Sequence, residues 1–147
     1  MKAYLNCELC TAEPQMDSKG GHGYVVTKHA GFVKFWLPNF LFDAQYLPIE
    51  TVSLDEGKSI EEHITPELVD GFIRDVGVIE RECILTVTAL LINGFEMIES
   101  IDLSNLGDGD DAGEKLCMER IKARIKEALS FALQWAVSLL SSAGGSR

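Results

Sequence analysis

The sequence predicts an α+β protein in which small antiparallel β-hairpins pack against a long C-terminal amphipathic helix and a shorter central helix. Three patterns indicate this class. Two aromatic and β-branched runs follow each other between residues 23 and 36, an Asn-Gly pair divides a second set of such runs, and a helical repeat of apolar residues fills the last third of the chain. With 147 residues, 46% of them hydrophobic, the chain can form a stable core.

The first part of the chain, residues 1–52, is expected to form a β-rich lobe. The runs 23–27 and 31–36 are separated by a short turn-like segment, which predicts a β-hairpin. Residues 40–46 are expected to form one or two helical turns. The polar stretch 53–62 then reads as a linker between this lobe and the next module.

The second module is expected over residues 63–141, followed by a flexible tail at 142–147. Thr65 can cap free backbone N–H groups and Pro66 suits the first position of a helix, so a helix is predicted to start here. An apolar stripe follows, and Gly77 is the expected end of this central helix.

A strand is predicted from Glu82 to Ile92, because this segment is rich in β-branched residues. The pair Asn93-Gly94 accommodates the positive φ of a tight turn and predicts a hairpin with the following run, 95–99.

The last helix is predicted to begin near Ala112. Its apolar residues are spaced by alternating fours and threes and form one continuous face, namely Ile121, Ile125, Ala128, Ala132, Trp135 and Leu139. Beyond Ala128, apolar residues surround most of the helix, so this half must be covered on several sides. Either the N-terminal hairpin or a second copy of the chain could cover it, and the second option predicts a homodimer through the C-terminal helix.

The formal net charge is −10, from 23 acidic and 13 basic residues. Such a surface repels nucleic-acid backbones and anionic lipids, so we expect a basic protein surface as partner and neither a membrane nor direct nucleic-acid binding. Solubility alone explains the acidic charge equally well. No window of eighteen apolar residues occurs and the N-terminus lacks a basic segment followed by an apolar one, which predicts a cytoplasmic protein with reduced thiols at its 4 cysteines.

Neither a metal nor a cofactor is expected. Cys7 and Cys10 together with His22 and His29 resemble a zinc-binding spacing, but the two histidines are predicted to point to opposite faces of a strand. Zinc at these four residues remains the alternative to ordinary packed thiols.

The sequence also lacks a recognisable catalytic motif. The 3 histidines have no serine or cysteine in a nucleophile turn nearby, and no glycine-rich phosphate loop occurs. We therefore expect a protein that is not an enzyme.

Two charged clusters are candidate binding sites. Carboxylates gather near the positive N-terminal end of the predicted long helix, at Asp102, Asp108, Asp110, Asp111 and Glu114. One or two would suffice for capping, which makes the others candidates for contact with lysine or arginine of a partner, although a solvated loop explains them equally well. Phe35 and Trp36 on the N-terminal hairpin are the second candidate contact.

A basic cluster on the same helix is the alternative site. It consists of Lys115, Lys122, Arg124 and Lys126 and could hold phosphates. Glutamates are interleaved with these residues at helical spacing, which favours a solvent-exposed face with ion pairs between neighbouring turns.

Several motifs occur in the order found in a family of small, uncharacterised tailed-phage proteins, which this chain resembles over residues 63–125. They are Thr65-Pro66-Glu67, Thr86-Val87, Asn93-Gly94-Phe95, Glu99-Ser100 and Gly113-Glu114-Lys115. Ile98 stands where that family has glycine, and Lys126 stands where it has tryptophan. Residues 23–46, with a Gly-Tyr strand and a Trp-x-Pro strand, look like a second small phage module.

The resemblance implies a phage or prophage accessory protein. On that basis we expect a non-enzymatic anti-defence protein, an anti-CRISPR-like inhibitor that binds a basic, nucleic-acid-binding surface of a host defence complex. The alternatives are a binder that sequesters a nucleotide immune signal, with Trp36 or Trp135 stacking on the base, and a structural phage protein.

Overall fold

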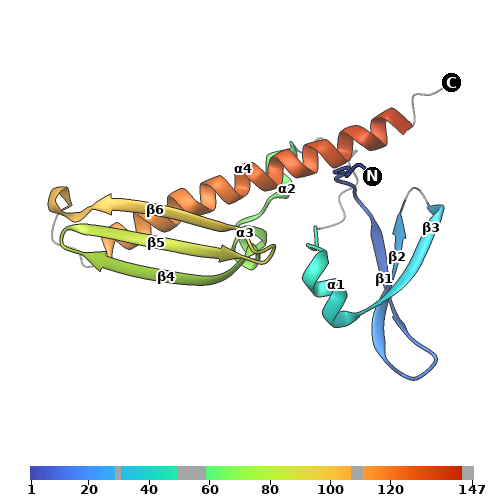
Figure 1. Cartoon of the computed structure of the whole chain (residues 1–147). Helices are drawn as coiled ribbons and strands as arrows, with labels where there is room; N and C mark the ends of the chain where they lie inside the picture. The colour runs from blue at the N-terminus through green and yellow to red at the C-terminus, as the bar shows by residue number, and fades with distance from the viewer. Residues whose placement is uncertain (29–30, 50–58, 107–110, 144–147) are drawn as a thin grey trace. The chain divides into compact units, whose positions relative to one another are not determined.

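The computed structural model describes residues 1–28, 31–49, 59–106 and 111–143, with side chains up to residue 139. The α+β class is confirmed, because the chain forms two three-stranded antiparallel sheets, a long C-terminal helix and shorter helices (Figure 1). The contacts divide it into two compact units, Met1–Pro48 with Phe131–Arg147 and Ile49–Ser130. None of the described helices has the length and apolar character needed to cross a membrane.

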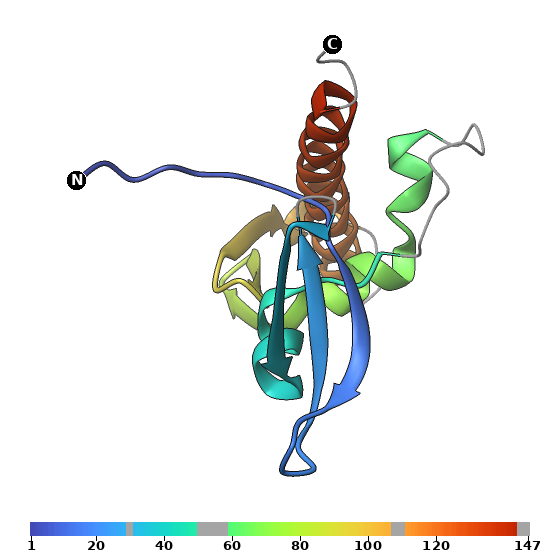
Figure 2. The ribbon, with the colours of Figure 1, turned by 90° about the vertical axis from the view of Figure 1, so that its right-hand side faces the viewer.

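The sheet of the first unit has the order β1-β2-β3, with β1 at Thr11–Met16, β2 at His22–Lys28 and β3 at Val33–Pro38 (Figure 2). The pairing of β2 with β3 confirms the predicted hairpin. β1 was not expected, because its sequence is polar and contains Pro14. Proline cannot donate a backbone hydrogen bond, and it is tolerated here because β1 is an edge strand.

α1, at Asn39–Gln45, confirms the helical turns expected after β3. An aromatic stack joins it to the sheet, because the ring of Phe42 lies 4.2 Å from that of Tyr24 and 4.8 Å from that of Tyr46. Val26 in β2 is fully buried on the same face as Tyr24. The aromatic residues of this lobe therefore stabilise its core.

Trp36 lies on the face of the sheet opposite to Tyr24 and Val26, and its side chain reaches from β3 across β2 to β1. Its indole Nε1 donates a hydrogen bond of 3.0 Å to the backbone carbonyl oxygen of Gln15 in β1. To reach across β2, the indole lies directly against Gly23, where a Cβ would collide with this ring and with the carbonyl oxygen of Leu37.

Replacing Gly23 by alanine is expected to destabilise the first unit by about 1–3 kcal/mol, because a clash with a backbone oxygen cannot be relieved by a rotamer change. Thermal denaturation followed by near-UV circular dichroism should show a lower Tm and a perturbed tryptophan signal. Gly77→Ala is the matched control, because no atom lies within 4 Å of a Cβ built there. An equal Tm for both variants would contradict the close approach.

The second unit begins with two short helices, α2 at Ile60–His63 and α3 at Pro66–Phe72. The predicted start at Thr65 is confirmed, because its hydroxyl accepts a hydrogen bond of 3.2 Å from the backbone N–H of Leu68. α2 lies where the end of the linker was expected. Its start is stabilised by the carboxylate of Glu62, which accepts a hydrogen bond from the backbone N–H of Ser59.

The prediction that the central helix continues to Gly77 is wrong. α3 ends at Phe72, and β4 follows at once over Ile73–Arg81. The apolar residues of this stretch fit a helical stripe in sequence, but pairing with β5 over the whole segment stabilises the extended form. Glu82, at a φ of 55°, makes the tight turn into β5.

β5, at Ile84–Leu91, and β6, at Glu96–Asp102, confirm the predicted hairpin, and Gly94 in its turn has a φ of 84°. The sheet order is β4-β5-β6. Every second residue of β5 is buried, and one of these residues, Leu85, lies next to Gly113 in the first turn of α4, the helix at Ala112–Ala143 (Figure 1). The core of the unit therefore lies between β5, β6 and the first half of α4.

The predicted apolar face of α4 holds only for its first half. Ile121 and Ile125 are fully buried, but Ala128 and Leu139 are exposed, and the buried residues further along are Leu133 and Ala136. The buried positions Ile121, Ile125 and Leu133 are separated by multiples of four residues. Because one helical turn takes 3.6 residues, side chains with this spacing move gradually around the helix.

The end of α4 is covered in part by the N-terminal segment of the same chain. The thiol of Cys7 donates a hydrogen bond of 3.4 Å to the backbone carbonyl oxygen of Ala132. This contact comes from the segment before β1, so coverage of the helix by the predicted hairpin and dimerisation through the helix both stay predictions.

Candidate functional site

The carboxylates predicted as a partner site lie in the second unit, where the short 3-10 helix η2 at Leu103–Asn105 meets the first turn of α4. Gly113 is buried at this contact. A Cβ there would approach Leu103 to 2.7 Å and Leu85 to 3.2 Å. Asp102 directly precedes η2, Asp111 directly precedes α4, and Glu114 follows Gly113 in the first turn of that helix; all three are exposed. We call them the acidic end.

Asp102 has a structural role within the acidic end. Its carboxylate accepts hydrogen bonds from the backbone N–H of Ser104 at 2.9 Å and from the hydroxyl of Ser104 at 2.6 Å. The hydrogen bonds from Ser104 lower the pKa of Asp102 below its ordinary value of 3.8. Asp102 therefore caps η2.

Replacing Asp102 by alanine is expected to lower the Tm by a few degrees at neutral pH, because η2 loses its cap. Since the pKa of this carboxyl is depressed in the folded protein, its contribution is present above pH 3.8 and is lost as the pH falls through the folded pKa. The difference in Tm between wild type and variant should therefore shrink below pH 3.8. A difference that stays constant down to pH 2 would contradict the capping role.

Asp111 and Glu114 have no comparable local role. Asp111 precedes α4, and its backbone carbonyl oxygen, not its carboxylate, accepts a hydrogen bond from the N–H of Lys115. Neither carboxylate forms an ion pair within the described part of the chain, although both gain from the positive end of the helix. Asp108 and Asp110 lie outside the described residues. The structure thus describes three of the five predicted carboxylates, one at the start of η2 and two at the start of α4.

Phe35 and Trp36, the other predicted contact, belong to the first unit. Trp36 has the structural role described above, and the half-buried ring of Phe35 lies 5.6 Å from the ammonium of Lys28. Next to β3, the aromatic side chains more available to a partner are Phe32 and Phe40, which are 89% and 72% exposed. Sequence reasoning missed them because periodicity alone does not show that both lie just outside β3.

The four basic residues proposed for phosphate binding do not converge. Arg124 pairs with Glu99 at 3.0 Å, and Lys122 pairs with Asp70 at 2.8 Å. Lys115 and Lys126 form no ion pair within the described residues, but they are separated by about 16 Å along α4.

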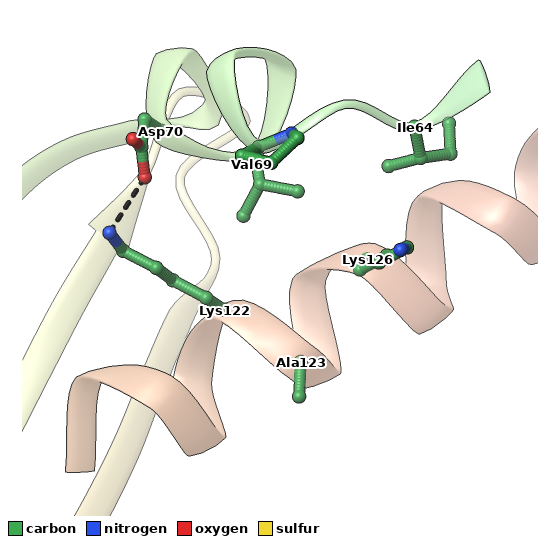
Figure 3. A pocket seen from close by; sticks show the side chains of 7 residues that line it. Ile64, Val69, Asp70, Lys122, Ala123 and Lys126 are labelled. Atoms are coloured by element: carbon green, nitrogen blue, oxygen red, sulfur yellow. Dashed lines mark ion pairs between the residues drawn. The ribbon is translucent and has the colours of Figure 1, made fainter. Parts of the chain in front are cut away.

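Lys122 and Lys126 do line a shallow groove between α3 and α4. Ile64, Val69 and Ala123 form most of its remaining surface, and the ion pair between Asp70 and Lys122 lies at one end (Figure 3). The groove is open and largely apolar. Of the two lysines that line it, Lys122 is paired with Asp70, whereas Lys126 has no carboxylate partner among the described residues. One cation is a poor site for a polyphosphate.

The proposed zinc ligands also have other surroundings. Cys7 donates to Ala132, and partial burial raises the pKa of the Cys10 thiol, which disfavours the thiolate that zinc requires. His29 lies outside the described residues. Among the residues that are described, no three His, Cys, Asp or Glu side chains are grouped as a metal site.

No family model, no curated protein and no solved structure matches this chain.

Proposed function

We propose that this chain is a non-enzymatic phage anti-defence protein, an anti-CRISPR-like inhibitor that acts in the host cytoplasm by covering a basic, nucleic-acid-binding surface of a defence complex. The observation that carries this proposal is the acidic end. There Asp111 and Glu114 are exposed at the start of α4 and have no ion-pair partner among the described residues.

The charge of the chain supports the same proposal. The net charge is −10, yet the described residues form only three ion pairs with one another, which involve Glu8, Asp70 and Glu99. Most carboxylates of the described residues are therefore not held in an ion pair within the chain. An acidic surface attracts a basic partner over roughly one Debye length and accelerates the encounter.

The resemblance to phage accessory proteins supplies the biological setting. A host protein that binds nucleic acid presents a basic surface, and an acidic protein can occupy that surface without any catalytic group. Together with the resemblance, this charge complementarity supports a defence complex as the target class.

The nucleotide-sequestering alternative has weaker support. Its best feature is the groove with Lys126, but Lys122 and Arg124 are already paired with carboxylates. Titration calorimetry with cyclic nucleotides tests it directly, and we expect no heat of binding at micromolar concentrations.

A pull-down from a phage-infectable host lysate tests the main proposal. The full chain as bait should capture a basic nucleic-acid-binding subunit in stoichiometric amount and release it as the salt concentration rises. The bait Asp111→Lys/Glu114→Lys should capture much less of the same subunit. Capture of no basic protein by the wild-type bait would refute the proposal.

A further inference from the structure

The free edge of the second sheet is unusual for a monomer. β4 is an edge strand of 9 residues, which at about 3.4 Å per residue spans roughly 30 Å. Natural edge strands are normally short, or are interrupted by proline, a central charge or a bulge. β4 has one irregularity at its start, between Ile73 and Asp75, and its central residues from Val76 to Ile79 are all uncharged.

On the helix-facing side of this sheet, the side chains of β5 are buried but those of β4 are partly exposed. Val87 in β5 is fully buried, whereas Val78, which lies directly opposite Val87, is 44% exposed. Val76 is 38% exposed, although its partner Ala89 is also fully buried. On the other face, Ile79 is 57% exposed. The edge thus presents apolar side chains on both faces. The backbone N–H of Val76 donates a hydrogen bond of 2.9 Å to the carboxylate of Asp75, and no second strand pairs with this edge among the described residues.

The charges of β4 are complementary to a second copy of the same strand. Arg74 and Asp75 come before the apolar centre, and Glu80 and Arg81 follow it. If two copies pair antiparallel about an axis through Gly77, Glu80 of each copy lies opposite the position of Arg74 in the other, at the irregular start of that strand. Both residues are exposed, and neither forms an ion pair within the described part of one chain.

Two-fold symmetry limits which residues of the two β4 strands can lie opposite one another. An axis perpendicular to the sheet places helix-facing residues opposite helix-facing residues, because opposite residues in an antiparallel pair share a face. Val76 and Val78 are helix-facing and Ile79 is not, so even-numbered residues must face even-numbered ones. The register that would oppose Arg74 to Arg81 violates this rule.

We propose that two copies of this chain associate through antiparallel pairing of β4 with β4 about a two-fold axis at Gly77, forming a continuous six-stranded sheet. Val76 then faces Val78 of the other copy, and opposite charges meet at both ends of the pairing. This inference is independent of the proposed function. If both hold, the dimer presents two acidic ends to its target.

The first test is the mass in solution as a function of concentration. Light scattering and sedimentation should show a concentration-dependent rise from 16.2 kDa toward about twice that mass, with a Kd of roughly 1–100 µM, as expected for a small transient interface. A mass of one chain at every concentration up to about 500 µM would overturn the proposal.

Charge exchange tests the surface. Arg74→Glu and Glu80→Arg should each weaken dimerisation about tenfold, because each places like charges opposite one another twice. The double variant Arg74→Glu/Glu80→Arg should restore the dimer to within about threefold of wild type. Glu96→Arg on the other edge strand, β6, is the matched control and should leave dimerisation unchanged. Dimerisation that responds to none of these changes, or equally to Glu96→Arg, would overturn the pairing through β4.

Disulfide trapping tests the axis. In a chain with serine at Cys7, Cys10 and Cys83, Gly77→Cys should form a disulfide-linked dimer under mild oxidation. Facing residues in an antiparallel pair have Cα atoms about 4.5–5.5 Å apart, within the range that a disulfide spans. Gly77 has open space for the new side chain. Glu96→Cys in the same background should remain monomeric on a non-reducing gel, and equal cross-linking of both variants would overturn the proposed axis.

Discussion

Replacing Ile121 by alanine is expected to destabilise the second unit by about 3–4 kcal/mol, the largest effect among single substitutions considered for this chain. Ile121 is fully buried in α4, where it belongs to the same core as Val87 and Leu91 of β5. Removing three carbon atoms there forfeits their transfer free energy and leaves a cavity that the surrounding sheet cannot close. Chemical denaturation should show the loss as a lower midpoint with an unchanged slope.

Ile98→Ala is the matched control, because Ile98 is 53% exposed on the outer face of the same sheet. Its loss should stay below about 1 kcal/mol, within the range of surface substitutions in strands. Similar losses for both variants would contradict the placement of the core between β5 and α4.

Reversing two charges at the acidic end should weaken binding to the captured host subunit by roughly tenfold or more. In Asp111→Lys/Glu114→Lys, two attractive groups become repulsive toward a basic surface, which mainly lowers the association rate. Both side chains are exposed, so the Tm should fall by only a few degrees through the lost interaction with the helix dipole. Surface plasmon resonance and thermal denaturation separate the two effects.

The chain offers a closely matched control for this pair. Glu61 and Glu67 are exposed carboxylates in the first turns of α2 and α3, so Glu61→Lys/Glu67→Lys makes the same change in net charge at other helix starts of the same unit. If both double variants weaken binding equally, net charge rather than the acidic end is responsible.

Local signals predicted the elements that depend on a few neighbouring residues. Thr65 caps α3 through a hydrogen bond only three residues away, and the turn at Asn93-Gly94 is closed by the positive φ of Gly94. Such features need no distant partner, so the sequence pattern is sufficient.

Elements that depend on pairing could not be predicted in this way. β1 is polar and contains Pro14, and only its register with β2 makes it a strand. β4 has a helix-compatible apolar spacing, and its extended form depends on β5, which lies beyond the turn at Glu82. In both cases long-range contacts override the local pattern.

In the candidate site, too, local features could be predicted and features that depend on long-range contacts could not. Clustering in sequence was enough to place Asp111 and Glu114 together, since both flank the start of one helix. The separate roles of Asp102, which caps η2, and of Trp36, which bonds to Gln15, depend on side-chain geometry that spacing does not reveal. The carboxylate partners of Lys122 and Arg124 come from α3 and β6, which no pattern on the helix itself could indicate.

The most direct test of the central claim is the salt dependence of the association rate between the wild-type chain and the host subunit that it captures. If the acidic end docks on a basic surface, the rate should fall by at least about tenfold between roughly 50 mM and 500 mM salt, while the dissociation rate changes little. Asp111→Lys/Glu114→Lys should bind more slowly at low salt and show a flatter dependence. An association rate that is independent of salt, and equal for the two proteins, would contradict electrostatic docking through the acidic end.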